Sequence, residues 1–384
     1  MSEKKANKIV SDPVVKFFAS VVGIFVIAFV LMELKHIFIP FVISYFLFFF
    51  FEPLNDFLSS KRIPLSVIIV VNLLIVISII YGISIIVIDS STSLAAKLPV
   101  YERKLNAIIS EAAVSLGIKN RAFTHFNISK VLQLTDYTTV ASGVFSSTIS
   151  MFTSIFLSLF FFIFISSGHS KIIEAIRLRF VEKEIKSALK RIKKEYEETH
   201  DIHNESETEE YLANVTIQRE EKLRKTFKDI TQQVQKYVVT KFLISLSVGL
   251  VVGVILWLFN IEFYIIWGIL SALLNFIPNI GSVISTILPG LTALVQYESF
   301  GYALLIVAII IFFQNVIGNI IEPKIFGNRL GLNPLVILIS LLVWGYLWGI
   351  IGMFLSVPLT AIIKIVISNS HSKNMQFFTN LMNN

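Results

Sequence analysis

The sequence contains no cysteine and few charged residues. Without cysteine, the chain has neither a disulfide framework nor thiolate ligands for a metal. Lys, Arg, Asp and Glu make up 15% of the residues, whereas a soluble domain has about 25%. The chain also lacks a phosphate-binding Gly-x-x-x-x-Gly-Lys-[Ser/Thr] motif and the HExxH and GxSxG patterns of common hydrolases. We therefore expect no enzyme, no cofactor and no ATP-driven activity by this chain alone.

Long apolar runs dominate what is present. Hydrophobic residues make up 55% of the chain, and its mean hydropathy is +0.76. A membrane-spanning helix needs about 20 apolar residues, so the sequence predicts an all-α, polytopic membrane protein. The expected spans are 14–34 (an uncleaved first helix), 37–51, 64–88, 143–166 and 242–259. Shorter or interrupted, re-entrant helices are expected in the C-terminal half, at 263–277, 282–295, 302–316, 335–346 and 349–367.

The distribution of Lys and Arg predicts the orientation. Basic residues precede the first span and are dense between 171 and 241. Under the positive-inside rule, these segments and both termini lie in the cytoplasm. The predicted organisation is N-terminal transmembrane helices (1–89), an extracytoplasmic amphipathic segment (90–141), a transmembrane helix (142–169), a cytoplasmic helical hairpin with an acidic tip (170–241), a C-terminal transmembrane transport core (242–368) and a cytoplasmic tail (369–384).

The acidic tip of the hairpin, residues 195–210, contains no Lys or Arg. Such a block of like charge repels itself and is typical of a solvated loop. His200 and His203 lie within it, but no rigid element fixes a coordination geometry around them. We therefore predict no metal site. The +7 net charge does not indicate nucleic-acid binding, because no basic patch with interleaved aromatic residues is present.

A polar stripe marks the end of one apolar helix. Asn315, Asn319 and Glu322 follow a spacing of i, i+4 and i+7, and Gln314 borders them. Polar side chains on a membrane helix are expected to face a partner or water. We expect Pro323 to end this helix, and we expect Glu322 and Lys324 to form a gate pair. The alternative is an interfacial loop whose amides bond neighbouring helices.

Two segments of the C-terminal half share one pattern, a short helix, a glycine-containing break and a second helix that ends near proline. They cover residues 263–290 and 334–359. Paired interrupted segments of this kind are typical of transporter binding sites. Small residues that allow close helix packing are the alternative explanation.

The same segments carry a family resemblance. The stretches NFIPNIGSVISTILPGLTALVQ and EPKIFGNRLGLNPLVILISLLVWGYLWGIIGMFLSVPLTAIIKI are similar to signatures of the autoinducer-2 exporter family, the PerM-type permeases. Within the first, Asn275, Pro278, Asn279, Gly281 and Ser282 resemble the quorum-signal transport subgroup. The second matches at Glu322, Pro323, Gly327, Gly331, Leu332, Pro334, Gly345, Gly349, Gly352 and Pro358. The acidic tip departs from the shorter loop that is usual in the family.

The resemblance implies an inner-membrane permease with about eight spans that exports a small polar solute such as autoinducer-2. A sodium (cation)/proton antiporter and a non-transporting membrane scaffold remain as alternatives. The expected partners are membrane lipid and the solute, without nucleic acid, and a homo-oligomer is left open. The expected substrate path comprises Asn275, Pro278, Asn279, Gly281, Gln314, Asn315, Asn319, Glu322 and Lys324. The expected hinge and packing positions are Gly327, Gly331, Gly345, Gly349, Gly352 and Pro358.

Overall fold

The computed structural model describes residues 13–118, 153–169, 205–326 and 332–368, with a few isolated positions beside them. These segments are helical and contain no β-strand, which confirms the all-α prediction. The elements are α2 (Pro13–Glu33), α3 (Lys35–Ser60), α4 (Leu65–Ser115), the helix Thr153–His169, α8 (Glu205–Leu258), α9 (Tyr264–Leu274), α10 (Ile280–Tyr297), α11 (Phe300–Asn315), η1 (Val316–Ile321), α12 (Glu322–Phe326) and α13 (Pro334–Ser368).

Within the described residues, six helices are long and apolar enough to cross a membrane. Three shorter apolar helices accompany them, at Phe17–Glu33, Thr153–His169 and Tyr264–Leu274. Many large hydrophobic side chains on these helices are exposed on the outside of the protein. Lipid covers such surfaces at no cost in free energy, so the architecture is that of a multi-pass membrane protein.

Two helices extend well beyond their apolar parts. α4 continues from its expected span 64–88 to Ser115, well into the segment 90–141 that the sequence predicts to be extracytoplasmic and amphipathic. α8 joins the second arm of the predicted hairpin to the span 242–259 as one helix of 54 residues. The first arm and most of the acidic tip, with His200 and His203, lie outside the described residues.

Close backbone contacts hold α8, α9 and α10 together. A Cβ atom on Gly249 of α8 would lie 2.5 Å from the carbonyl oxygen of Gly268 in α9. A Cβ atom on Gly281, in the first turn of α10, would overlap the carbonyl oxygen of Leu274. The turn between α9 and α10 is made by Pro278 and by Asn279, whose φ is 62°. The predicted break near Pro278 is therefore confirmed.

Pro323 does not end the helix that begins at Phe300, so this prediction was wrong. The chain runs from α11 through the π-helical turn η1 into α12, which contains Pro323 as its second residue. A proline is tolerated in the first turn of a helix, where its missing N–H would have no intrahelical acceptor. The π-helical turn η1 changes the pattern of backbone hydrogen bonds just before Pro323, so the helix continues past the proline to Phe326.

α13 is two half-helices joined at Gly349, as the sequence pattern predicted. Gly349 has φ 66° and ψ −143°, a conformation that a residue with a side chain rarely adopts. The halves fold back on each other. This brings the Ser340 hydroxyl of the first half within 3.0 Å of the Ser356 carbonyl oxygen of the second half, to which it donates a hydrogen bond. At the fold, the indole nitrogen of Trp348 donates a hydrogen bond of 2.9 Å to the Leu31 carbonyl oxygen of α2.

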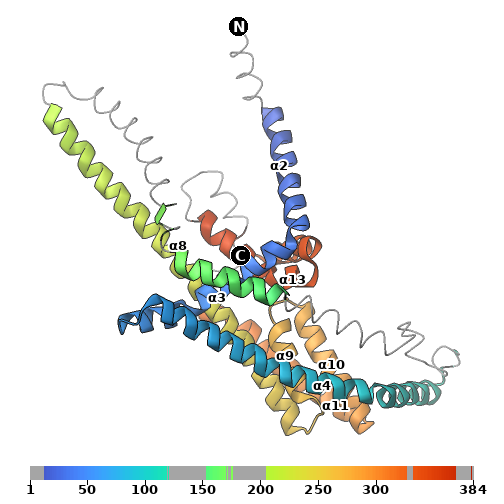
Figure 1. The fold of residues 1–384 in the computed structure, drawn as a ribbon. Helices are drawn as coiled ribbons and strands as arrows, with labels where there is room; N and C mark the ends of the chain where they lie inside the picture. Colours follow the sequence, from blue (N-terminus) through green and yellow to red (C-terminus); the bar gives the residue numbers. More distant parts are fainter. Residues whose placement is uncertain are drawn as a thin grey trace.

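The helices form three main packing centres. One core fills the space between α8, α9, α10 and α11, where Val252, Leu256, Ile306 and Ile310 are almost fully buried. A second joins α3, α4 and the helix Thr153–His169, and a third joins α2, α3 and α13. Figure 1 shows the long helix α4 crossing the group formed by α9, α10 and α11, and contacts of α4 with α9 and α10 support this placement.

Candidate functional site

A nearly buried ion pair joins α8 to α12. The Nζ atom of Lys241 lies 2.7 Å from Oε1 of Glu322, and the two side chains are 9% and 23% exposed. One helical turn earlier, Tyr237 is buried and its ring stacks on Phe326 at 5.2 Å between centroids. The Tyr237 hydroxyl has no hydrogen-bond partner within the described residues. A buried cation, a carboxylate and a free hydroxyl therefore lie at one helix junction.

The predicted Glu322–Lys324 gate pair is wrong, because Lys241 is the partner of Glu322. Residues at i and i+2 of a helix point to different sides and do not face each other. Lys324 is exposed, whereas Lys241 approaches Glu322 from the neighbouring helix. Sequence reasoning placed Lys241 at the end of the cytoplasmic segment. The signal for its role was its position directly before the apolar run 242–259.

A large cavity of about 1030 Å³ lies beside this junction. Its walls come from α3, α4, the helix Thr153–His169, α8, α9 and α13, so both halves of the chain contribute. Tyr237 and Lys241 line it on α8, Phe276 follows the end of α9, and Trp348 and Pro358 line it on α13. A cavity of this size between helices is typical of a ligand site in a helical membrane protein.

The residues of the predicted path do not converge on this cavity. The Asn275 amide donates to the Ser245 hydroxyl on α8 at 3.0 Å. Gln314 faces α10, where its amide donates to Ser285 at 3.0 Å. Pro278 and Asn279 shape the turn before α10, and Gly281 makes the close contact with Leu274.

The stripe of Asn315 and Asn319 is exposed on the outer side of the α11–η1 helix. The Asn319 amide donates to Oδ1 of Asn315 at 2.8 Å, and the Asn315 amide donates to the Ile311 carbonyl oxygen at 2.9 Å. Glu322, the third predicted member of the stripe, turns instead toward α8. The structure thus separates Glu322 and Gln314 from the two asparagines.

The expected hinge positions have different surroundings. A Cβ atom on Gly345 would lie 2.8 Å from the Met353 side chain, and one on Gly352 would overlap the Trp344 carbonyl oxygen. These two glycines therefore allow the halves of α13 to pack closely around Gly349. Gly327 and Gly331 lie outside the described residues.

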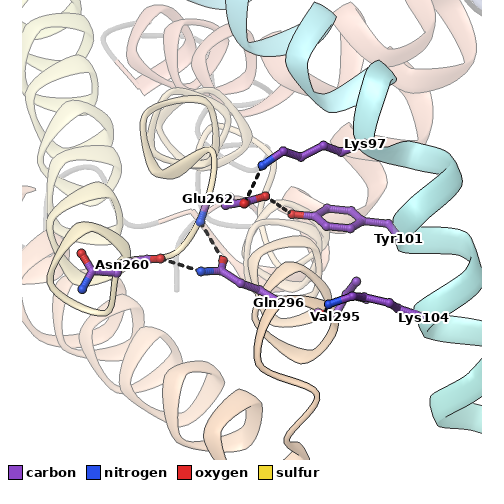
Figure 2. Close-up of polar contacts among 7 residues, drawn as sticks. All are labelled: Lys97, Tyr101, Lys104, Asn260, Glu262, Val295 and Gln296. Carbon is purple, nitrogen blue, oxygen red and sulfur yellow. Dashed lines mark hydrogen bonds and ion pairs between the residues drawn. The ribbon is translucent and has the colours of Figure 1, made fainter.

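A second polar cluster, the Glu262 cluster, ties α4 to the turn between α8 and α9. It consists of Glu262, Lys97 and Tyr101. Figure 2 shows both side chains of α4 reaching the Glu262 carboxylate, Lys97 at 2.6 Å from Oε1 and Tyr101 at 2.6 Å from Oε2. The backbone N–H of Glu262 also donates to Gln296 of α10 at 2.9 Å. Sequence reasoning missed this cluster, because its members are far apart in the chain.

The electrostatics of the Glu262 cluster favour the carboxylate. Partial burial raises the pKa of Glu262, but hydrogen bonds from Lys97 and Tyr101 and the positive charges of Lys97 and Lys104 outweigh it, so the pKa is lowered overall. Burial, followed by the hydrogen bond and the negative charge of Glu262, raises the pKa of the Tyr101 hydroxyl. The cluster is therefore an ionised contact at neutral pH. Beside it, Lys104 pairs with Glu298 at 2.7 Å.

The described residues contain no group of three His, Cys, Asp or Glu side chains that is placed to bind a metal ion. The polar chemistry that the structure offers is therefore ionic and hydrogen-bonding. Two contacts stand out, the Lys241–Glu322 pair beside the large cavity and the Glu262 cluster beyond the apolar part of α4.

Comparison with known proteins places the chain in a family. A sequence profile described as AI-2E family transporter matches residues 17–203 and 204–371. The chain is 44% identical over 137 residues to the AI-2 transport protein TqsA of Escherichia coli (strain K12), which covers 36% of this chain and 40% of that protein. It is 42% identical over 132 residues to YhhT of the same strain, and this match covers 34% of this chain and 38% of YhhT. It is 35% identical over 140 residues to YrrI of Bacillus subtilis (strain 168), and this match covers 36% of this chain and 39% of YrrI.

These pairwise matches span about two fifths of each relative's length. YhhT and YrrI are named only as candidate transport proteins. The family profile, in contrast, covers nearly the whole chain, and the described helices agree with it. The chain therefore belongs to the AI-2E family of membrane transport proteins.

Proposed function

We propose that this protein is an exporter of a small polar solute, and that autoinducer-2 is the first solute to test. Membership of the AI-2E family and the similarity to TqsA support this choice. The proposal includes an inner-membrane location with both termini in the cytoplasm, which the distribution of basic residues supports. It includes no enzymatic step.

The observation that carries the proposal is the large cavity beside the Lys241–Glu322 pair. Helices from both halves of the chain line it, and the ion pair links one wall of the cavity, on α8, to α12. A transporter must open such a cavity to one side of the membrane at a time. An ion pair between two helices can serve as a contact that forms in one state and separates in another.

Mechanically, α12 and α13 are the candidate moving parts. α12 follows the π-helical turn η1, and such turns are frequent at functional sites. α13 carries the break at Gly349, and its second half contributes Leu355 and Pro358 to the cavity wall. In this proposal, separation of Lys241 from Glu322 frees α12, while α13 pivots at Gly349 and changes access to the cavity.

Proteoliposomes test the proposal directly. Vesicles that contain the purified protein are expected to move labelled autoinducer-2 faster than empty vesicles, without a sodium gradient. The Lys241→Gln/Glu322→Gln variant keeps the two side chains similar in shape but removes their charges, and we expect it to slow transport. Lys324→Gln is the matched control, because Lys324 is exposed. Equal rates in protein-containing and empty vesicles would reject the proposal for this solute.

The cation/proton antiporter is the second candidate, because a carboxylate paired with a nearly buried lysine in a membrane protein is a typical proton-coupling element. It predicts a sodium-driven pH change inside vesicles that Glu322→Gln abolishes. The scaffold alternative predicts that deletion of residues 197–210 removes a cellular function while transport continues.

The exposed Asn315–Asn319 pair on an apolar helix supports one further proposal, a contact with a second copy of the chain. Cross-linking through a cysteine at position 315 would detect that contact.

A further inference from the structure

The large cavity has an apolar lining over most of its surface. Phe46, Phe50, Phe51, Phe242, Phe276 and Phe354 line it, together with Trp348 and several aliphatic side chains. These residues come from α3, α8, α13 and the end of α9. A solute that fills this space must therefore present a substantial apolar surface to it.

Polar groups border the cavity at particular places. Lys241 lines the wall on α8, and the ring of Tyr237 lines it one turn away, while the Tyr237 hydroxyl is buried away from the open space. Lys35 and His36, in the first turn of α3, also line the cavity. Glu322, which pairs with Lys241, is not among the lining residues. The ionised side chains that line the cavity are thus cationic.

We infer that the large cavity binds a single-chain anionic amphiphile, whose apolar tail lies among the phenylalanines and whose anionic head contacts Lys241. The inference rests on the proposed function only in taking this cavity as the substrate site. It assigns to this cavity a solute with an apolar body and one acidic head, a class different from the small polar solute of the proposed function.

The chemistry of the walls separates this class from polyhydroxylated solutes. Each hydroxyl that is buried without a hydrogen bond is costly in free energy, and the aromatic walls offer few partners. Each methylene that leaves water for an apolar wall is favourable. An anionic head can also take the place of the Glu322 carboxylate as the ion-pair partner of Lys241. Binding would therefore compete with the Lys241–Glu322 pair and loosen the contact between α8 and α12.

Tryptophan fluorescence tests the inference, because Trp348 lines the cavity and Trp257, on α8, is 56% exposed and does not. Two variants are prepared in detergent, each with one of these tryptophans kept and the other three replaced by phenylalanine. Brominated dodecanoate at pH 8 is expected to quench Trp348 saturably at concentrations that leave Trp257 unquenched. Equal quenching of the two would show partition into the detergent and overturn the inference.

The head group is tested with matched ligands and variants. Brominated dodecanol has the same tail without the charge, and we expect it to bind about tenfold more weakly, the effect of one lost charged hydrogen bond. Lys241→Gln/Glu322→Gln should weaken dodecanoate binding by a similar factor and leave dodecanol binding unchanged. Lys97→Gln, which removes the lysine of a pair away from the cavity, is the control. Equal binding of acid and alcohol to the unmodified protein would reject the anionic head.

A second measurement applies if the single-tryptophan variants do not fold. Dodecanoate should raise the thermal unfolding temperature of the unmodified protein more than dodecanol does, because a ligand stabilises the state that binds it. A two-chain anionic phospholipid that gives the same shift, with none from dodecanoate, would identify the cavity as a lipid site and reject the single-chain ligand.

Transport of autoinducer-2 without dodecanoate binding would overturn this inference alone. Dodecanoate binding without transport of any solute would overturn the proposed function alone.

Discussion

Lys241 and Glu322, which are 81 positions apart in the chain, meet at 2.7 Å between Nζ and Oε1 where α8 contacts α12. Lys241 is only 9% exposed at the side chain. Water therefore solvates its ammonium group poorly, and Glu322 supplies most of the compensating charge. Loss of one partner is accordingly more harmful than replacement of both.

The first prediction concerns this pair. Glu322→Leu leaves the Lys241 charge without its partner and should lower stability by about 3–5 kcal/mol, whereas Lys241→Met/Glu322→Leu should restore most of the loss. The measurement is thermal unfolding of the purified protein in detergent. Lys324→Met is the control and should unfold like the unmodified protein, because Lys324 is exposed. If Glu322→Leu unfolds at the same temperature as the unmodified protein, the pair does not stabilise the α8–α12 contact.

The second prediction follows from the lowered pKa of Glu262. Its folded pKa lies below the unfolded value of about 4.3. The stabilisation by the ionised carboxylate is therefore fully present above pH 4.3 and is lost as the pH falls through the folded pKa. Glu262→Gln should unfold at a lower temperature than the unmodified protein at neutral pH, and the difference should disappear in strong acid.

Glu298→Gln is the control for this pH series, because the Glu298 side chain is 58% exposed, against 34% for Glu262, and an exposed carboxylate in an ion pair contributes little. Its unfolding temperature should follow that of the unmodified protein throughout. A difference for Glu262→Gln that persists in strong acid would mean that packing, and not the charge, holds α4 on the turn between α8 and α9.

The breaks in the helices were predictable, because each depends on a local signal. Pro278 lies in the turn before α10, and Gly349 adopts a backbone conformation that favours glycine. The span that ends in α11 and the apolar part of α8 also follow from apolar composition alone. Pro323 was the exception among the local signals, because the π-helical turn before it changes the register and allows the helix to continue.

The site contacts were not predictable from local signals. Lys97 and Glu262 are 165 positions apart, and Lys241 and Glu322 are 81 positions apart. Helical periodicity groups residues on one helix, as it grouped Asn315 with Glu322, but it does not identify the neighbouring helix that each side chain faces. The paths of α8 and α4 through the fold supply that information.

The third prediction concerns close packing at the break between α9 and α10. Gly281→Ala places a Cβ atom onto the Leu274 carbonyl oxygen, and a backbone atom cannot move aside as a flexible side chain can. We expect the variant to give little folded protein in size-exclusion chromatography. Gly301→Ala is the matched control, because nothing lies within 4 Å of its added methyl group. Equal yields of the two variants would show that the approach of α10 to α9 is looser than in this structure.

The fourth prediction concerns orientation, and the absence of native cysteine makes it direct. If the N-terminus is cytoplasmic, a cysteine at Asn120, beyond the end of α4, should react with an impermeant thiol reagent added outside the cell. A cysteine at Ser206, in the first turn of α8, should react only after permeabilisation. The reverse pattern would invert the proposed topology.

The fifth prediction concerns the exposed pair Asn315 and Asn319. If this face contacts water along a solute path, Asn319→Leu should lower transport by a factor that corresponds to about 1–3 kcal/mol of lost hydrogen bonding. Thermal stability should change little, because leucine is favourable in a membrane helix and the lost bond joins two exposed side chains. Transport by proteoliposomes and thermal unfolding are measured on the same preparation.

Accessibility to a water-soluble thiol reagent separates a wet face from a packed one. Ile317 is 7% exposed on the same helix, whereas Asn319 is exposed. If the face is wet, Asn319→Cys should react in the assembled protein, and Ile317→Cys should not. If Asn319→Cys is unreactive and Asn319→Leu lowers stability more than transport, the two amides form a structural contact with another chain. A solute path along this face would then be excluded, because a packed interface leaves no water to carry the solute.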